Sequence, residues 1–264
     1  MKHQLFGQQI HIATGGRTFD NKKTCLFFIH GSGQNHLTWV LQTRYFAYRR
    51  YGVLAPDFPG HGLSGGTPFD SIEAMADWVI SLLDSLGVQR ACLVGHSQGC
   101  LVALDAAARY PERVSHIGLI AGALAIPVND QLLSLSDTAL TKAIGVMTSW
   151  GHGAVAHMYD NTQPGHSFIG YGNRLMEMND PAALRNDLTA CSNFNNGKDA
   201  AAKIVQPALV LIAGADRMTP AKFGKAMANS LANSHCQILA GAGHMLPAEQ
   251  PAAVNHALRH FLPT

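Results

Sequence analysis

Short, uninterrupted hydrophobic runs recur along the chain, and each is followed within two residues by glycine or proline. They cover residues 25–29, 52–55, 91–94, 117–120 and 208–212. Their residues do not alternate between apolar and polar, so both faces of each strand should be buried. This pattern is typical of a parallel sheet that is covered by helices on both sides.

Helical patterns lie between these runs. Between Ser71 and Gly87 the apolar residues recur every three or four positions, with Ser71 as a good N-cap and Gly87 as a good stop. The Ala- and Leu-rich residues 98–109 predict a second helix, and residues 251–261 predict the last one. The alternation of strands and helices predicts an α/β fold with a mostly parallel, doubly wound sheet.

The pattern changes between residues 123 and 196, where turn-forming residues become frequent and no strong strand run occurs. Asp180 followed by Pro181 is typical of an N-cap and a first helical position, and it predicts a helix that continues to about Phe194. We therefore expect a helical insertion, residues 123–196, on a core made of residues 1–122 and 197–264.

Composition excludes several functional classes. Of 264 residues 47% are hydrophobic and 14% are charged, and the formal net charge is +2, so the chain should fold into a globular protein. It has no basic run that would indicate nucleic-acid binding. No window holds about 18 consecutive apolar residues, so no membrane span is expected.

Cysteine usage and the N-terminus bear on the compartment. The five cysteines form no Cys-x-x-Cys pair and most lie in apolar runs, so we expect buried thiols in a reducing, cytoplasmic setting rather than a disulfide framework. The first residues lead into a polar stretch, and no secretory signal is expected there.

The most informative motif is Gly95-His96-Ser97-Gln98-Gly99, which follows a predicted strand and opens a predicted helix. A Gly-x-Ser-x-Gly motif in this context forces a sharp turn that exposes the serine hydroxyl at the carboxyl end of the sheet. Ser97 is therefore the candidate nucleophile.

Partners for such a serine follow other predicted strands. In 30–33, the backbone N–H of Ser32 could join that of Gln98 as an oxyanion hole, although the segment could also be an ordinary turn. Asp216 follows the run 208–212 and could orient an imidazole, or could simply cap a helix. His244 follows a predicted strand at 237–239, and its Gly-rich turn could carry the imidazole to Ser97.

The order Ser97, Asp216, His244, each after a separate strand, resembles the α/β-hydrolase fold family. The segment 57–64 also resembles the one that follows the fourth strand in that family. The resemblance implies that Ser97 is the nucleophile, His244 the base and Asp216 the acid. It also implies that Ser32 and Gln98 form the oxyanion hole and that residues 123–196 are a cap.

One residue departs from the pattern of many relatives, which have a second glycine where this chain has Cys100. Cysteine is small, so the tight packing of helix on strand should survive. We expect no catalytic role for Cys100, and Ser97 itself is the serine expected of a serine hydrolase.

The remaining polar side chains have simpler expected roles. The alternation at the turn points His96 away from the pocket, and Asp57 should anchor its loop by hydrogen bonds. Asp187 should face solvent or form a salt bridge.

The insertion carries aromatic and histidine side chains, namely Trp150, His152, His157, Tyr159 and His166. Their spacing is irregular for a metal site, so we expect no metal and assign them to pocket lining instead. His30, Trp150 and Met245 are our candidates for contact with substrate.

Together these features predict a serine hydrolase that cleaves an ester of a small or medium apolar acid through an acyl-enzyme. No cofactor is needed for this chemistry. Hydrolysis of a carbon–carbon, lactone or amide bond on the same fold remains open, and so does a ligand receptor with slow turnover.

Overall fold

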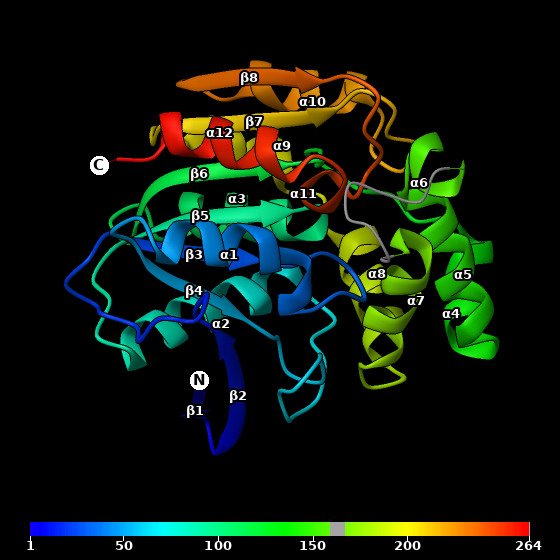
Figure 1. Cartoon of the computed structure of the whole chain (residues 1–264), viewed down its shortest axis with the longest axis horizontal. Coiled ribbons are helices and arrows are strands. Elements are labelled where there is room, and N and C mark those ends of the chain that lie inside the picture. Colours follow the sequence, from blue (N-terminus) through cyan, green and yellow to red (C-terminus); the bar gives the residue numbers. More distant parts are fainter. Residues whose placement is uncertain (159–166, 264) are drawn as a thin grey trace.

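The computed structural model describes residues 1–158 and 167–263, in which a central sheet is flanked by helices (Figure 1). The described part forms an eight-stranded sheet with the order β1-β2-β4-β3-β5-β6-β7-β8. The strands are β1 (Lys2–Leu5), β2 (Gln8–Ala13), β3 (Cys25–Ile29), β4 (Gly52–Pro56), β5 (Ala91–His96), β6 (Val114–Ile120), β7 (Ala208–Ala213) and β8 (Ser234–Leu239).

The strand predictions are confirmed in the core of the sheet. From β4 through β3, β5, β6 and β7 to β8 all pairs are parallel, and the predicted hydrophobic runs lie in β3 to β7. Every residue of β3, β4, β5 and β7 is buried, as a sheet covered on both faces requires. The α/β prediction of a mostly parallel sheet is therefore correct.

The sequence pattern missed β1 and β2, which form an antiparallel hairpin at the edge of the sheet. These strands alternate exposed and buried positions, and their first residues are polar. Leu5, Ile10 and Ile12 of the hairpin belong to the hydrophobic core, and Ala13 packs against the core on the other face of the sheet. The N-terminal hairpin is thus an amphipathic addition to an apolar sheet.

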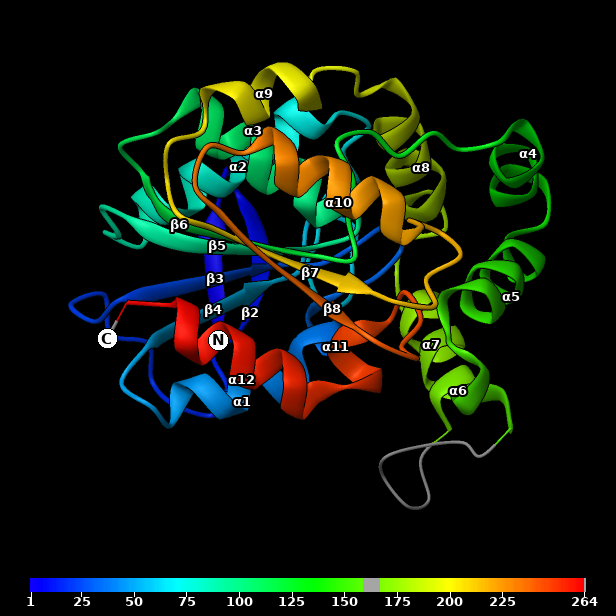
Figure 2. The same ribbon diagram turned by 90° about the horizontal axis from the view of Figure 1, so that it is seen from above.

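Two helical layers cover the sheet (Figure 2). One layer contains α2 (Ile72–Ser85), α3 (Gln98–Arg109), α9 (Gly197–Lys203) and α10 (Ala221–Ser230), and the other contains α1 (Val40–Ala47), α11 (Leu246–Glu249) and α12 (Pro251–Phe261). Each layer packs its apolar side chains on one face of the sheet to form a separate hydrophobic core. The predicted limits of α3 and α12 are confirmed.

The caps of α2 also agree with the prediction. The hydroxyl of Ser71 accepts from the N–H of Ala74, and Gly87 has a φ of +66° just beyond the helix. The prediction for the start of the helix near residue 180 is wrong, because α8 (Ala183–Asn193) begins at Ala183. The Asp180 carboxylate instead accepts from the N–H of Ala182 in the turn that precedes α8.

The chain between β6 and α9 is helical in its described part. It contains α4 (Asp130–Thr138), α5 (Leu140–Gly151), α6 (Ala154–Met158), α7 (Phe168–Glu177) and α8. These helices lie beyond the carboxyl ends of the parallel strands, on the right in Figures 1 and 2. Ile144, Met147, Leu184 and Leu188 belong to a small core of their own.

Two further findings concern the compartment and the membrane. All five cysteines are free, and Cys236 alone among them is exposed. None of the described helices combines the length and the hydrophobicity needed to cross a bilayer.

Candidate functional site

Ser97 lies in the sharp turn between β5 and α3. Its φ of +54° and ψ of −119° are angles that residues with a side chain rarely adopt. A Cβ on Gly95 would collide with the carbonyl oxygen of Gly99, and a Cβ on Gly99 would collide with that of Ile29. Both glycines of the motif are therefore required for α3 to pack this closely against the sheet.

Cys100 fits the same close packing. Its thiol donates to the carbonyl oxygen of Gly95 over 3.3 Å and is fully buried. Burial raises the pKa of this thiol, so it stays protonated and inert. The cysteine acts as a small hydrophobic residue at a position where a larger side chain would not fit.

The imidazole of His244 and the carboxylate of Asp216 face each other. His244 Nδ1 lies 2.8 Å from Asp216 Oδ2, and both side chains are almost completely buried. They come from the loops that follow β8 and β7, which are neighbouring parallel strands. Ser97 and His244 line the same cavity. The structure thus brings together the three residues that lie far apart in the sequence.

Three further contacts fix the Asp216 carboxylate. Its Oδ1 accepts from the N–H groups of Met218 and Thr219, and its Oδ2 lies 2.7 Å from the Thr219 hydroxyl. Burial alone would raise the pKa of Asp216, but the attraction and hydrogen bond of His244 and the bonds from Thr219 outweigh it and lower the pKa. The carboxylate is therefore ionised at neutral pH and accepts the Nδ1–H of His244.

His96 holds the backbone at His244. Its Nε2 donates to the carbonyl oxygen of His244 over 2.8 Å. Burial, together with the nearby His244, lowers the pKa of His96 to about 3, so the ring is neutral. The expectation that His96 points away from the pocket agrees with its absence from the cavity lining. Its contact with the His244 turn has no signal in the sequence.

The loop after β3 lies against Ser97. A Cβ on Gly31 would lie 3.1 Å from Ser97 Cβ, so the backbone passes directly beside the serine. Among the described residues the N–H of Ser32 has no hydrogen-bond acceptor. Gln98 is the first residue of α3, where an N–H has no acceptor within the helix and the helix dipole favours negative charge. These two groups are the candidate oxyanion hole.

A cavity opens over Ser97 between the sheet and the helices α4, α5, α7 and α8. It has a volume of about 130 Å³ and is mainly apolar, with Ile126, Val128, Leu132, Met147, Leu188 and Met218 in its wall. Its position and lining suit an apolar ligand next to the serine.

Some of the candidate pocket residues line the cavity and one does not. Trp150, Met245 and His152 line the cavity. His30 lies behind the loop instead, because its Nε2 accepts from the N–H of Phe58 and its Nδ1 lies 3.0 Å from the carbonyl oxygen of Gly31. His30 therefore does not line the cavity, and its contacts instead hold the loop after β3.

The rest of the histidine and aromatic group is dispersed or not described. His157 is exposed and lies 3.0 Å from the carbonyl oxygen of Ser149. Tyr159 and His166 lie outside the described residues. Nothing in the described part of this group forms a metal-ligand cluster.

Of the two roles expected for Asp187, exposure to solvent is wrong and a salt bridge is confirmed. Asp187 does not face solvent but is completely buried, and its Oδ2 lies 3.0 Å from Nε2 of His61. Nothing in the spacing of residues marked this pair, because His61 precedes β5 and Asp187 lies on α8.

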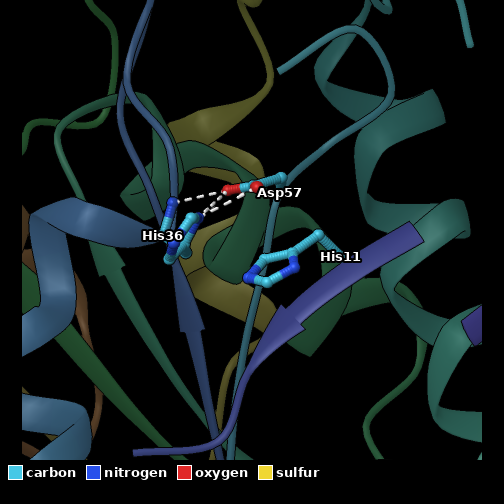
Figure 3. Close-up of side chains that lie close together, drawn as sticks. All are labelled: His11, His36 and Asp57. Atoms are coloured by element: carbon cyan, nitrogen blue, oxygen red, sulfur yellow. Dashed lines mark hydrogen bonds and ion pairs between the residues drawn. The ribbon is translucent and has the colours of Figure 1, made fainter. Parts of the chain in front are cut away.

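A third histidine–aspartate pair, His36 and Asp57, lies away from the cavity and next to His11 (Figure 3). One ligand atom from each lies within 4.8 Å of the others, so these residues could hold a metal ion, which the sequence did not suggest. The Asp57 carboxylate already accepts from the backbone N–H and the ring of His36 and from the N–H of Leu63. A metal ion would have to displace the ring proton, and the observed bonds make Asp57 the expected anchor of its loop.

The Asp57 anchor should contribute to stability in a pH-dependent way. Burial would raise the pKa of Asp57, but the hydrogen bonds and charge of His36 and the N–H of Leu63 lower it overall. A carboxyl group with a lowered folded-state pKa contributes stability above its unfolded-state pKa of about 3.9, and this is lost as the pH falls through the folded-state value.

We therefore expect Asp57→Asn to lower the free energy of unfolding at pH 7 by about 1–3 kcal/mol. The variant should also lose less stability than the wild type as the pH falls below about 4. Urea unfolding between pH 3 and pH 8 measures both effects. Asp84→Asn, at an exposed surface ion pair with Arg113, is the control and should change stability little. If the free energy of unfolding of Asp57→Asn and of the wild type depends on pH in the same way, Asp57 is not the source of the pH-dependent stability.

Comparison with known proteins places this chain in a family. Residues 26–257 match the sequence profile of the Alpha/beta hydrolase family. A pimeloyl-[acyl-carrier protein] methyl ester esterase from Neisseria meningitidis is 31% identical over 83% of this chain and 86% of its own length. The acetyltransferase component of an acetoin cleaving system from Pseudomonas putida is 28% identical over 90% of this chain.

This chain spans 63% of the length of the Pseudomonas putida protein, which is less than two thirds. Among solved structures, the enol-lactonase from Burkholderia xenovorans is similar with a TM-score of 0.87 at 21% identity, over 99% of each chain. At that identity the likeness shows the fold alone. Because the family profile covers most of the residues, this chain belongs to the alpha/beta hydrolase family.

Proposed function

We propose that this protein is a serine hydrolase that cleaves carboxylic esters through an acyl-enzyme. The observation that carries the proposal is the buried His244–Asp216 pair at the cavity that also contains the strained Ser97. An oriented imidazole that shares a cavity with a serine hydroxyl is the arrangement that activates a nucleophile. No cofactor takes part in the proposed reaction.

The reaction begins when Ser97 Oγ attacks the ester carbonyl carbon while His244 Nε2 takes the hydroxyl proton. The carbonyl electrons move to oxygen, and the N–H groups of Ser32 and Gln98 donate to the resulting oxyanion. The tetrahedral intermediate then expels the alcohol, which receives the proton from His244. Asp216 stays ionised throughout and stabilises the imidazolium.

Water completes the cycle. It enters beside the acyl-enzyme, gives a proton to His244 and attacks the acyl carbon, which forms a second oxyanion in the same hole. Breakdown of this intermediate releases the acid and returns the proton to Ser97 Oγ. One ester and one water thus give one acid and one alcohol.

We infer that the helical segment 123–196 is a cap that determines which substrate is used. The apolar wall of the cavity comes largely from this segment, for example Val128, Leu132 and Met147. Apolar burial favours an acyl group without charge near the serine. The Neisseria meningitidis relative carries the name of a methyl ester esterase, which supports an ester as the substrate.

The test is a panel of p-nitrophenyl esters with acyl chains from acetyl upward, combined with a fluorophosphonate label. We expect labelling of the protein and the highest kcat/KM for short to medium acyl chains. A lactone, an anilide and a dienol-type diketone belong in the same panel, because the same fold can hydrolyse those bonds. If one of these compounds is hydrolysed faster than the esters, its bond type would become the proposed substrate in place of an ester. Absence of labelling would favour a ligand receptor.

Trp150 tests the role of the cap. Its side chain lines the cavity and is 49% exposed, so its removal should affect substrate more than stability. Trp150→Ala removes apolar contact worth about 1–3 kcal/mol of substrate binding. We expect KM to rise about ten-fold for bulky acyl esters and much less for acetyl esters, with kcat little changed.

Phe223→Ala is a matched control, since Phe223 is 46% exposed on α10 and does not line this cavity. It should leave the acyl-chain profile unchanged. A large drop in melting temperature for Trp150→Ala together with an unchanged profile would contradict the pocket role.

A further inference from the structure

One buried charged pair has no part in the proposed reaction. Asp187 and His61 have no side-chain exposure, and they lie 3.0 Å apart. The ring nitrogens of His61 face two acceptors, Asp187 Oδ2 and the carbonyl oxygen of Pro59, so the ring carries both protons. In keeping with this, the pKa of His61 is raised overall. Burial lowers this pKa, but the charge and hydrogen bond of Asp187 raise it by more than burial lowers it.

Stability alone explains this pair poorly. Asp187 Oδ1 is buried and has no hydrogen-bond partner among the described residues. Burial of a charged group that is only partly satisfied opposes folding, and such pairs are often replaceable by apolar residues without loss of stability. A charged group kept in this state therefore points to a role beyond packing.

The second contact of Asp187 indicates what this role is. Its Oδ2 accepts from the backbone N–H of Gly33 over 2.7 Å. Gly33 follows Ser32 directly, so the carboxylate fixes one side of the candidate oxyanion loop. A carboxylate that accepts a backbone N–H makes a strong, charge-assisted bond.

The other side of Ser32 is fixed as well. The carbonyl oxygen of Gly31 accepts from the N–H of Gln34 over 3.1 Å and lies 3.0 Å from His30 Nδ1. A trans peptide is planar, so the N–H of Ser32 points away from the Gly31 carbonyl, on the opposite side of the bond. Restraints on the two consecutive peptide groups thus set the direction of the Ser32 N–H.

The same helix contacts the second candidate donor. The backbone carbonyl oxygen of Asp187 accepts from Nε2 of Gln98 over 3.1 Å. The turn before α8 adds Asn179, whose Nδ2 donates to the carbonyl oxygen of Gly33 over 2.6 Å. The segment that we assign to the cap therefore contacts Gly33, which follows Ser32, and the side chain of Gln98.

We propose that Asp187 is a positioning residue for the oxyanion hole, which its carboxylate holds in its active geometry from the cap through the N–H of Gly33. The proposal rests on the proposed function. It means that the cap does more than select substrates, because the hole is complete only when α8 is seated on the loop after β3. His61 holds the buried carboxylate in place.

The test compares two inhibitors that share one acyl chain, a trifluoromethyl ketone and the corresponding methyl ketone. The trifluoromethyl ketone adds the Ser97 hydroxyl to form a tetrahedral oxyanion, whereas the methyl ketone measures ground-state binding. Loss of one oxyanion donor typically costs about 10²–10³ in rate, and a misplaced donor costs part of that.

For Asp187→Ala we expect kcat on an ester to fall about 10- to 100-fold, with KM within about three-fold of the wild type. The Ki of the trifluoromethyl ketone should rise by the same factor as kcat falls, and the Ki of the methyl ketone should stay within about three-fold. Asp187→Asn keeps the shape and one acceptor oxygen for Gly33, so it should recover part of the loss. If the alanine variant does not fold, kcat and the two Ki values are measured on Asp187→Asn instead.

Asn186→Ala is the control on the same helix. Asn186 Nδ2 donates to the carbonyl oxygen of Pro68. The substitution therefore removes one hydrogen bond of α8 that does not involve the candidate oxyanion loop. We expect both Ki values to stay near those of the wild type. An equal rise of both Ki values in Asp187→Ala would mean a general loosening of the pocket and would overturn the positioning role.

The two proposals fail in different ways. If the wild type hydrolyses esters and takes the fluorophosphonate label, but Asp187→Ala leaves kcat and both Ki values unchanged, only the role of Asp187 is overturned. If the wild type takes no label and binds both ketones equally, the serine hydrolase proposal fails and the role of Asp187 fails with it.

Discussion

Replacement of Ser97 by alanine should abolish fluorophosphonate labelling and lower kcat on esters by at least about 10³. Alanine keeps the Cβ atom, so the unusual backbone angles of the turn and its packing on Gly95 and Gly99 should not change. Only the attacking oxygen is lost. The loss is large because the nucleophile, the base and the acid act as one unit.

Labelling, single-turnover kinetics and thermal unfolding of the same preparation check this result. Ser81→Ala is the control, since that hydroxyl donates to the carbonyl oxygen of Asp77 within α2, away from the cavity. A folded Ser97→Ala variant that keeps more than about a tenth of wild-type activity would exclude Ser97 as the nucleophile.

Asp216→Asn should keep the fold and lose about 10⁴ in kcat. In the wild type, Oδ1 accepts from two backbone N–H groups, which leaves Oδ2 for His244 and for the Thr219 hydroxyl. An asparagine whose oxygen accepts from the backbone must turn its NH₂ group toward Nδ1 of His244. The ring then carries its proton on Nε2, where it cannot accept the proton of Ser97.

The tautomer of His244 can be followed by nitrogen NMR of labelled histidine, next to the steady-state rates. Asp137→Asn, at an exposed position on α4, is the control and should leave both unchanged. If Asp216→Asn stays active while Asp57→Asn loses activity, the assignment of the acid would have to move to Asp57. The structure argues against that outcome, because the Asp57 carboxylate is bound to His36 instead.

The sequence by itself determined the central sheet and the position of the candidate site. Continuous hydrophobic runs favour burial on both faces, so β3 to β7 could be predicted from the hydrophobic pattern along the chain. Parallel strands end at one edge of a sheet, and side chains just beyond their carboxyl ends must gather there. Ser97, Asp216 and His244 could therefore be grouped before any distance was known.

The tertiary structure alone decided the contacts that connect separate segments. The amphipathic hairpin of β1 and β2 escaped prediction because few of its residues enter the core. His30 turned out to lie behind its loop, and His96 to hold the backbone of His244. Neither contact follows from a local pattern, since the partner of a side chain depends on which loops the fold brings together.

The contacts of Asp187 are the clearest example of contacts that a local sequence pattern cannot predict. Its partners, His61 and the N–H of Gly33, lie 126 and 154 residues away in the sequence. Periodicity predicts which face of a helix is apolar, but it cannot predict that a buried carboxylate will find two distant donors. Local sequence pattern determines strands, helices and turns, whereas the pairing of buried polar groups depends on three-dimensional packing that only the folded chain provides.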